Sequence, residues 1–539
     1  MYRCINAAER AFSHSNTQRG EQVLRRFSEP RPKRKKKKKK KEEERLDQTI
    51  MKKIYDYVLI GTGPGSSSWL RSILKRNENA RIAVLEKGPF NKTDILTERN
   101  PFAALHASRT MVKEYEHEVM QGSCLGGGTG VNNYAWVTPS ENDLNNYDCA
   151  EGVKNVNLEC FHDLCENLAY KGPIHPLHNL MTQHAHEKFD LNVRSNYKSR
   201  VHEVNRGHVH LGTPTIDNHG IRRSAYSAVM EPLLRKHHGN VNLFCDTECN
   251  RVLFEKDKAV GVVDVAGQTY EARKAVVVGA GCLETPALLM RSGIGCREML
   301  RDSNIDVLVD NPEVGQNLRD KMLTDDMIIT NSKLSGFDKS LFLMNIILSD
   351  GASIQLHRYD KLTFGNTYLA LTRLIRGNGL LSTSTYRNIL KYATPTNVFC
   401  FQTYFKMKSS ASITLNKSNL SAQLNADALF EEAKRDKEKF RTRLNEMYGV
   451  VDGMKSENLK YTYCVPDIRV DPSKHMRLVW HFAGSCASGK VVDPDRAFEV
   501  LGTKNLHIVD NSVLVEPPDG GAQPTAYLTG YLAGNMMQI

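Results

Sequence analysis

Two stretches near opposite ends of the 539-residue chain contain residues whose types and spacing could do chemistry. In GTGPGS, Gly61, Gly63 and Gly65 follow a short apolar run and precede a helical one. Glycines at this spacing permit a tight turn and a close approach of the main chain to a phosphate at a helix N-terminus. In WHFAGSC, His481 is a side chain that takes up a proton near neutral pH. We therefore expect phosphate binding near one end of the chain and proton transfer near the other.

The residues around Gly61 predict a strand, a turn, a helix and a second strand. Residues 55–60 are apolar, and the apolar run 82–85 ends at Glu86. Between them, one helix face would carry Trp69, Leu70, Ile73 and Leu74. In a dinucleotide-binding unit of this kind, Glu86 would accept hydrogen bonds from ribose hydroxyls. Ser66 stands at the usual third glycine position, where a small side chain should be tolerated. A glycine-rich turn can also be only a turn, so this motif needs support from others.

A second glycine cluster, GSCLGGGTGVNN from Gly122, is too rich in glycine for the interior of a helix or strand. Its main chain could pass close to a flat ligand, and it could equally be a structural loop. The residues that would contact such a ligand are Gly126, Gly127, Thr129, Asn132 and Asn133.

Later segments add expected elements of a mixed α/β protein. Residues 274–281 are typical of a buried strand that ends in glycine, and a helix is expected from Glu284. Residues 331–470 lack glycine motifs, and we assign them to a substrate-facing region. This region contains an expected amphipathic helix with an apolar side formed by Leu429, Phe430, Ala433, Phe440, Leu444 and Met447.

The net charge of +12 is concentrated in the first 50 residues. This segment has 16 Lys and Arg against 7 Asp and Glu, so it contributes +9 and the remainder only +3. We expect residues 1–50 to be a disordered basic extension, because like charges at this density repel one another. A nuclear-localisation or polyanion-binding patch, a targeting peptide, and Met51 as the natural start are the alternatives. The charge of the folded body gives no indication of nucleic-acid binding.

Cysteine usage and hydropathy narrow the class of protein further. The 12 cysteines include no CxxC pair, so we expect no metal site and reduced thiols in an intracellular, cytoplasmic protein, unless the basic extension directs it to an organelle or the nucleus. The longest apolar stretches, such as LFLMNIIL from Leu341, fall short of the roughly 20 residues that span a bilayer. We therefore expect a soluble protein without a transmembrane segment. Its oligomeric state is not predicted.

The ordered motifs resemble those of the glucose-methanol-choline (GMC) oxidoreductase family, whose members are FAD enzymes that oxidise alcohols. They are GTGPGS, LGGGTGVNN, GIRRSAYSAV, GAGCLETPALLMRSGIG, VGQNL and HFAGSC with VVD and IVDNS after it. The resemblance implies a discontinuous FAD-binding Rossmann-like domain with a second, α+β substrate-binding domain. The expected divisions are 51–330 for the first FAD-binding part (with 151–221 partly a lid), 331–470 for the substrate-binding domain and 471–539 for the C-terminal return. Ser123, Cys282 and Lys321 depart from the usual family residues.

The resemblance also implies roles for particular residues. His481 matches the family's active-site base, and further FAD contacts are implied at Gly281, Asp510, Pro524 and Thr525. The partner that holds the substrate oxygen is Gln523, or Gly521 in an ungapped alignment. Val131 stands where some members link FAD covalently through histidine, so non-covalent FAD is implied.

The function implied by the resemblance is oxidation of a small-molecule alcohol, with hydride transfer to flavin N5 and His481 as base. The natural electron acceptor is not predicted. An FAD-containing lyase and a catalytically inactive flavin-binding protein are the alternatives. The segment KMKSSASITL from Lys406 lacks the Ser-Arg-Gly of fatty-acid photodecarboxylases, which argues against that reaction.

Overall fold

The computed structural model describes most of the chain after Lys52. The described residues are 53–90, 108–114, 117–132, 135–169, 183–184, 186–188, 192–194, 200–204, 206–210, 213–215, 217, 221–330, 342–358, 398–453, 455, 461–463 and 468–539. Lys53 begins a compact unit that runs to Ile539. The expected basic extension and the expected ligand contact at Asn133 lie outside the described residues.

A parallel sheet forms around the first predicted strand. Strand β1 (Lys53–Ile60) lies between β12 (Thr269–Val278) and β2 (Ile82–Leu85), parallel to both. Strand β9 (Val241–Phe244) extends the sheet beyond β2, and β25 (Leu506–Ile508) extends it beyond β12. Four further strands are antiparallel additions: β10 (Cys249–Glu255), β11 (Lys258–Asp264), β23 (Val492–Asp493) and β24 (Glu499–Val500). The expected α/β class with a Rossmann-like sheet is confirmed, and the C-terminal return supplies β25.

Two helices pack together beside this sheet. Helix α3 (Pro64–Arg76) connects β1 to β2, and it buries the predicted apolar face of Trp69, Leu70, Ile73 and Leu74. Burial of Leu70 or Ile73 stabilises the fold by about 1.5–3 kcal/mol each. Helix α17 (Ala522–Met536) packs against α3. A Cβ on Gly530 would collide with the carbonyl oxygen of Gly65, so glycine allows the closest approach of the two helices.

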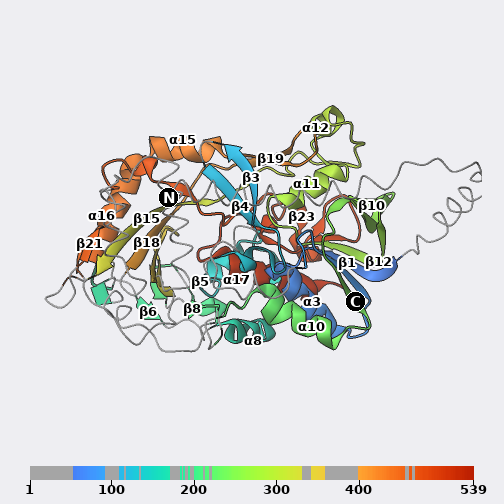
Figure 1. Cartoon of the computed structure of the whole chain (residues 1–539), viewed down its shortest axis with the longest axis horizontal. Coiled ribbons are helices and arrows are strands. Elements are labelled where there is room, and N and C mark those ends of the chain that lie inside the picture. The colour runs from blue at the N-terminus through green and yellow to red at the C-terminus, as the bar shows by residue number, and fades with distance from the viewer. Residues whose placement is uncertain are drawn as a thin grey trace, which may run out of the picture. The chain divides into compact units, whose positions relative to one another are not determined.

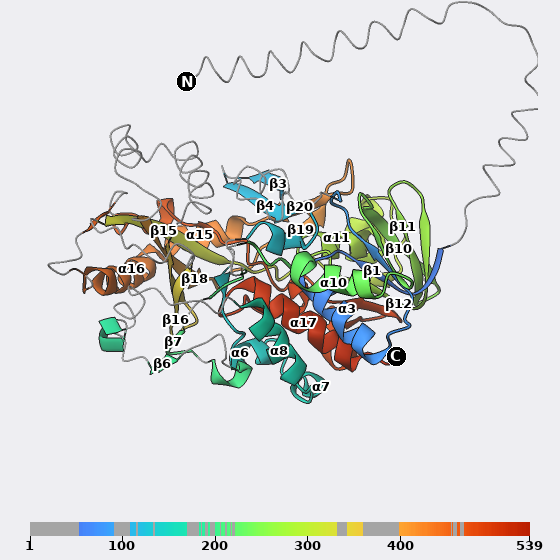
Figure 2. The same ribbon diagram turned by 60° about the horizontal axis from the view of Figure 1, so that its bottom comes forward.

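A second sheet of largely antiparallel strands lies on the other side of the body, with α17 between the two sheets in both views (Figures 1 and 2). Its strands are β21 (Tyr461–Tyr463), β15 (Lys321–Thr330), β18 (Val398–Lys406), β17 (Ser353–Arg358), β16 (Phe342–Ile347), β7 (His208–His210) and β6 (Asn192–Arg194), with β22 (Arg477–Leu478) also on β15. Only β6 and β7 among these pairs are parallel.

The predicted single amphipathic helix is wrong, because the structure has two helices there. Helix α15 (Asp427–Arg435) ends at Asp436, and α16 (Lys437–Gly453) begins directly after it. The main chain of Asp436 leaves the helical conformation, and its carbonyl accepts hydrogen bonds from the amides of Lys439 and Phe440. Aspartate is favoured at helix ends, because its side chain can hydrogen-bond to nearby backbone groups and so competes with the hydrogen bonds of a helix interior. The predicted apolar side chains are nevertheless buried, apart from the half-buried Phe430.

Other helices lie around the sheets. They are α6 (Glu141–Asn145), α7 (Glu151–Lys154), α8 (Glu159–Leu168), α10 (Glu231–Lys236), α11 (Glu284–Arg291) and α12 (Arg297–Asp302). Short hairpins pair β3 (Ser108–Glu114) with β4 (His117–Gly122) and β19 (Ser412–Leu415) with β20 (Ala422–Asn425). Within the described part of the chain, none of the helices is long and apolar enough to cross a bilayer.

The divisions at residues 330 and 470 stay a prediction. The second sheet includes β6, β7 and the start of β15 before the first division, and β22 after the second.

Candidate functional site

The turn between β1 and α3 leaves a main-chain cradle at the start of the helix. Gly61 has φ +87°, and a Cβ there would collide with the carbonyl oxygen of Gly279, so only glycine fits. A Cβ on Gly65 would likewise collide with the carbonyl of Val509. A Cβ on Gly63, by contrast, would have no atom within 4 Å, and this N-cap residue has no side-chain cap. The free amides of the first helical turn are therefore open to an anionic ligand.

Ser66 packs against the strand rather than into the cradle. Its side chain is buried, and its Oγ has no hydrogen-bond partner among the described residues. A Cβ on Gly279 would collide with this Oγ, so the glycine in β12's following turn makes room for the serine. The expected tolerance of a small side chain at this position is thus explained by a glycine on the strand side.

The second glycine cluster lies beside the first turn. Its residues Gly127–Gly130 form a single 3₁₀ turn, and a Cβ on Gly127 would approach Gly63 Cα to 3.2 Å. The Gly126 amide donates to Thr62 Oγ1 at 2.9 Å. Thr129 is buried, and its Oγ1 accepts from the Ala225 amide at 2.8 Å. The fold therefore brings the two glycine turns together, as expected if both line one ligand.

Glu86 joins the end of β2 to the turn after β1. Its buried carboxylate accepts from the Thr62 amide at 3.1 Å, Thr62 Oγ1 at 2.5 Å and the Gly88 amide at 2.8 Å. Burial raises the pKa of this carboxyl, although these hydrogen bonds act to lower it. Glu86 therefore holds the turn after β1 in place, a role that the sequence did not suggest beside the expected ribose contact.

Asn132, Arg222 and Gln523 form a directed chain of hydrogen bonds. Arg222 donates to Asn132 Oδ1 at 2.7 Å and to the Asn132 carbonyl at 2.8 Å. Because arginine can only donate, Asn132 must present its oxygen to Arg222 and its Nδ2 to Gln523. Gln523 accepts from that Nδ2 through Oε1, and its buried Nε2 has no partner among the described residues. Arg222 thus orients Gln523 so that an amide donor remains free.

His481 follows a strained residue that Asp320 holds in place. Trp480 has φ +66°, which costs about 1–3 kcal/mol outside glycine. The carboxylate of Asp320 accepts from the amides of Trp480 at 2.8 Å and His481 at 3.0 Å. The ring of Tyr404 lies nearly parallel to the imidazole, with centroids 6.1 Å apart. Asp320 therefore fixes the position of the main chain at His481.

The imidazole of His481 is kept neutral and keeps one buried nitrogen free. Burial lowers its pKa to about 3, and the positive charges of Lys321 and Arg477 act in the same direction. Its buried Nδ1 has no hydrogen-bond partner in the part of the chain that the structure describes. A neutral imidazole with a free nitrogen can accept a proton from a ligand.

The remaining predicted residues lie in the C-terminal segment or contact it. Asp510 Oδ2 accepts from the Gly281 amide at 2.9 Å and from Thr285 Oγ1 at 2.7 Å. Pro524 and Thr525 lie in the first turn of α17, where Thr525 Oγ1 donates to the Ala522 carbonyl at 3.0 Å. Gly521 is the N-cap of α17, so it contributes no side chain.

Sequence reasoning overlooked Thr62, Arg222 and Asp320, and treated Lys321 only as a family departure. Arg222 lies in the quoted string GIRRSAYSAV, and Asp320 directly precedes Lys321. A charged residue within or next to a motif was the signal available in the sequence for both. The described residues contain no group of three or more His, Cys, Asp or Glu arranged to hold a metal.

Comparison with known proteins gives concordant matches. Two models described as GMC oxidoreductase match residues 65–323 and 408–530. A putative GMC-type oxidoreductase of Acanthamoeba polyphaga mimivirus is 25% identical over 370 residues, 64% of this chain and 61% of that protein. The oxygen-dependent choline dehydrogenase of Sinorhizobium fredii (strain NBRC 101917 / NGR234) is 26% identical over 536 residues, 89% and 95% of the two chains. The match spans only 53–56% of the length of several other curated relatives.

Solved structures share the fold. A formate oxidase is similar with a TM-score of 0.66 and 17% identity, over 90% of this chain and 98% of that one. The pyridoxine 4-oxidase of Mesorbium loti has the same TM-score and identity, over 89% and 98%. Since the two family models together cover more than half of the chain, including the second glycine cluster and the HFAGSC segment with the start of α17, the chain belongs to the GMC oxidoreductase family.

Proposed function

We propose that the protein binds FAD and oxidises an alcohol to an aldehyde or ketone, with His481 as the base and Gln523 as a hydrogen-bond donor to the substrate oxygen. The family and the names of relatives, which include a choline dehydrogenase and an aryl-alcohol oxidase, support an alcohol as substrate. The observation that carries the proposal is that His481 and Gln523 each keep a buried nitrogen without a partner among the described residues. An unsatisfied buried group costs about 1–3 kcal/mol, so such atoms are well suited to a bound ligand.

The residues present fit FAD. The open space in front of Gly63 and Gly128, where a Cβ would meet nothing within 4 Å, suits a pyrophosphate between the two glycine turns. Gly61, Gly65, Gly126, Gly127 and Thr129 would shape this cradle. Glu86 would contact the ribose, while Gly281, Asp510, Pro524 and Thr525 would lie along the rest of the cofactor. FAD, when bound, accepts the hydride that leaves the alcohol carbon.

The protein's own part in the reaction is to hold and move a proton. His481, neutral because burial and nearby cations depress its pKa, takes the hydroxyl proton of the alcohol. Gln523 offers an N–H to the same oxygen, because Asn132 occupies its carbonyl end. A donor at this position stabilises negative charge that develops on oxygen. Gln523, rather than Gly521, is therefore our candidate for the second position.

The directed chain predicts the effect of Asn132→Asp. Aspartate can only accept, so Gln523 would turn its amide nitrogen toward residue 132 and present an oxygen to the substrate. We expect flavin reduction by an alcohol to slow about five- to 150-fold, the equivalent of about 1–3 kcal/mol, in anaerobic stopped-flow measurements. Gln523→Ala should slow it to a similar extent, and the double variant should lose little more. A wild-type rate in Asn132→Asp that retains FAD would rule out this orienting role.

Non-covalent binding gives a second prediction. Because Val131 cannot form a histidyl link, acid precipitation of the purified protein should release all of its FAD into the supernatant. Absorbance of supernatant and pellet at flavin wavelengths measures this. Flavin that stays in the pellet would contradict the proposal.

Alcohol bleaching separates the proposed reaction from its alternatives. An anaerobic screen with primary alcohols, polyols and sterols should reduce the bound flavin and remove its yellow colour. A lyase or an inactive flavin-binding protein would stay yellow with every alcohol in the screen.

A further inference from the structure

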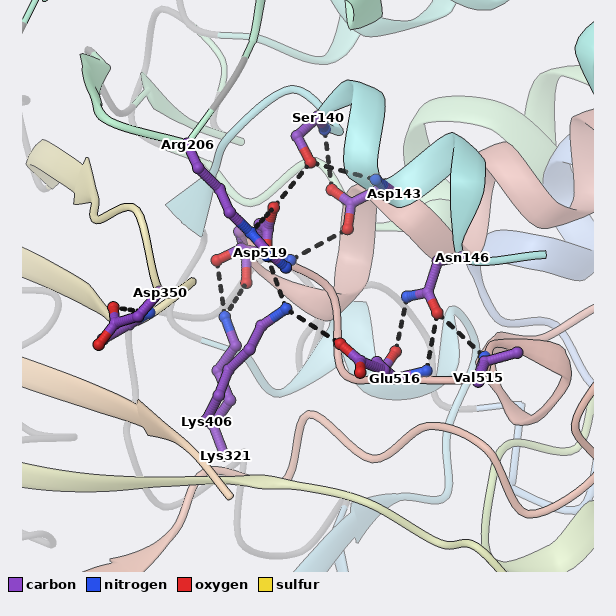
Figure 3. Close-up of polar contacts among 12 residues, drawn as sticks. Ser140, Asp143, Asn146, Arg206, Lys321, Asp350, Lys406, Val515, Glu516 and Asp519 are labelled. Atoms are coloured by element: carbon purple, nitrogen blue, oxygen red, sulfur yellow. Dashed lines mark hydrogen bonds and ion pairs between the residues drawn. The ribbon is translucent and has the colours of Figure 1, made fainter. Parts of the chain in front are cut away.

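Two lysines lie opposite one another on neighbouring strands of the second sheet. Lys321 on β15 pairs with Lys406 on β18 in the antiparallel register, and Lys321 is fully buried. Like charges directly opposite one another destabilise a sheet unless an anion compensates them. Asp519 fills this role: its Oδ1 lies 2.7 Å from Lys406 Nζ, and its main-chain carbonyl accepts from Lys321 Nζ at 2.6 Å (Figure 3).

Asp519 belongs to a loop that is held on several sides before α17 begins. Arg206 donates to both oxygens of its carboxylate, and Ser140 Oγ donates to Oδ2 at 3.1 Å. The Asp519 amide donates to Asp143 Oδ1 at 3.0 Å. Although burial acts to raise it, Lys406 and Arg206 hold the pKa of Asp519 below its usual value, so the carboxylate is charged. The loop therefore has one defined position relative to the second sheet.

Lys321 differs from Arg206 and Lys406 in what it binds. Those two cations bind the Asp519 side chain, whereas Lys321 Nζ donates to two main-chain carbonyls, of Asp519 at 2.6 Å and of Gly520 at 3.4 Å. These are the last two residues before Gly521, the N-cap of α17, and Gln523 follows two positions later. Lys321 thus acts on the main chain that determines where Gln523 lies.

The residue before Lys321 holds the other half of the candidate site. Asp320 accepts from the amides of Trp480 and His481, and it is adjacent to Lys321 at the beginning of β15. Successive side chains of an extended chain point to opposite sides. The dipeptide Asp320–Lys321 therefore connects the His481 segment on one side with the loop ahead of Gln523 on the other.

We propose that Lys321 is a positioning residue of the candidate active site, which fixes the main chain ahead of Gln523 relative to His481. The inference rests on the proposed function, because it takes these two residues as the pair that handles the alcohol oxygen. It gives a role to a residue that departs from the usual family sequence.

The ammonium also affects the charge of His481. Burial is the largest cause that lowers the pKa of the imidazole, and the positive charges of Lys321 and Arg477 lower it further. The carboxylate of Asp320 accepts a hydrogen bond from the main-chain amide of His481. The positive charge of Lys406 acts to lower the pKa of Lys321, and three carboxylates act to raise it: Asp519, Asp143 and Asp320. Burial lowers the pKa of Lys321 to about 7. Removal of this cation should therefore raise the pKa of His481.

The test is Lys321→Met, with Lys406→Met as the matched variant on the opposite strand. Asp519 keeps Arg206 and Lys406 when Lys321 is lost, so no carboxylate is left unpaired, and we expect Lys321→Met to fold. Flavin reduction should slow about five- to 150-fold, as for loss of the Gln523 donor. In a Gln523→Ala background, the same change should have less than about a twofold effect. Lys406→Met should slow the reaction less, because both carbonyls keep their donor.

Two measurements on the FAD-loaded protein need no turnover. Hydrogen exchange by mass spectrometry should be faster in peptides that cover residues 519–523 in Lys321→Met than in Lys406→Met. NMR titration of labelled histidine, assigned with His481→Ala, should give a higher pKa for His481 in Lys321→Met. If Lys321→Met does not fold, Lys321→Gln replaces it as the neutral variant.

The outcomes separate this inference from the proposed function. If no alcohol reduces the wild-type flavin but the exchange and the titration change as expected, the proposed function fails and the positioning role stands. If losses in rate multiply in the double variant, or if exchange at 519–523 is unchanged, Lys321 does not position Gln523.

Discussion

His481→Ala should bind FAD normally but reduce it with an alcohol about 10²- to 10⁴-fold more slowly than the wild type, the range typical of a general base. The Asp320 hydrogen bonds go to main-chain amides, so they remain when the imidazole is removed. The flavin site should therefore stay intact while the proton acceptor is lost. Anaerobic stopped-flow spectroscopy at saturating alcohol measures the rate, and the flavin spectrum measures cofactor content.

The pH dependence provides an independent check of the same residue. A base works only when it is unprotonated, so the rate should be constant above the pKa of His481 and fall below it. Because burial, Lys321 and Arg477 depress this pKa, the fall should begin well below pH 6.5, the usual value for histidine. In His481→Ala this acid limb should be absent.

His475→Ala is the control, since this histidine directly follows the turn Pro472–Lys474 and is not one of the candidate site residues. We expect it to retain the wild-type rate. If His481→Ala instead reduces flavin at the wild-type rate, His481 is not the base, and the proposed reaction is wrong for this protein.

Local features of the fold could be predicted from the sequence, because they depend on neighbours along the chain. The strand, turn, helix and strand around Gly61 follow from a run of apolar residues, a glycine pattern and a helical periodicity, and β1, α3 and β2 confirm them. The break at Asp436 was missed, because the apolar periodicity continues through it on both helices. A periodic pattern shows which face of a helix is apolar, but it does not show where one helix ends and the next begins.

Contacts between distant segments could not be predicted in the same way. The bond from Asn132 to Gln523 joins residues 391 positions apart, and that from Asp320 to the His481 amide joins residues 161 apart. Their geometry depends on how β15, α17 and the glycine loop meet, which no local pattern describes. Motif order located His481 and Gln523, whereas their orientation depends on Arg222 and Asp320.

The other large expected effect concerns Glu86, whose carboxylate organises the turn after β1. Glu86→Ala removes the acceptor of three hydrogen bonds, from the Thr62 amide, Thr62 Oγ1 and the Gly88 amide, and with it the expected ribose contact. Loss of a charged hydrogen bond to the ribose costs about 1.5–3 kcal/mol, so FAD should bind about ten- to a hundredfold more weakly. The variant should purify largely as apoprotein, as measured by flavin absorbance per protein and by titration with FAD.

Glu86→Gln separates the two roles of this carboxylate. The glutamine side chain has the same size as glutamate and keeps one acceptor oxygen. Its NH₂ group, however, would face the N–H and O–H donors of Thr62 or the N–H donor of Gly88. If the turn is the main role, Glu86→Gln should also lose FAD, because the buried amide leaves a donor unpaired. If the ribose contact is the main role, an amide oxygen should restore part of the affinity. Glu248→Gln, which removes the ion pair with Lys87 next to Glu86, should keep its FAD. A fully loaded Glu86→Ala would show that neither the turn nor the ribose depends on this residue.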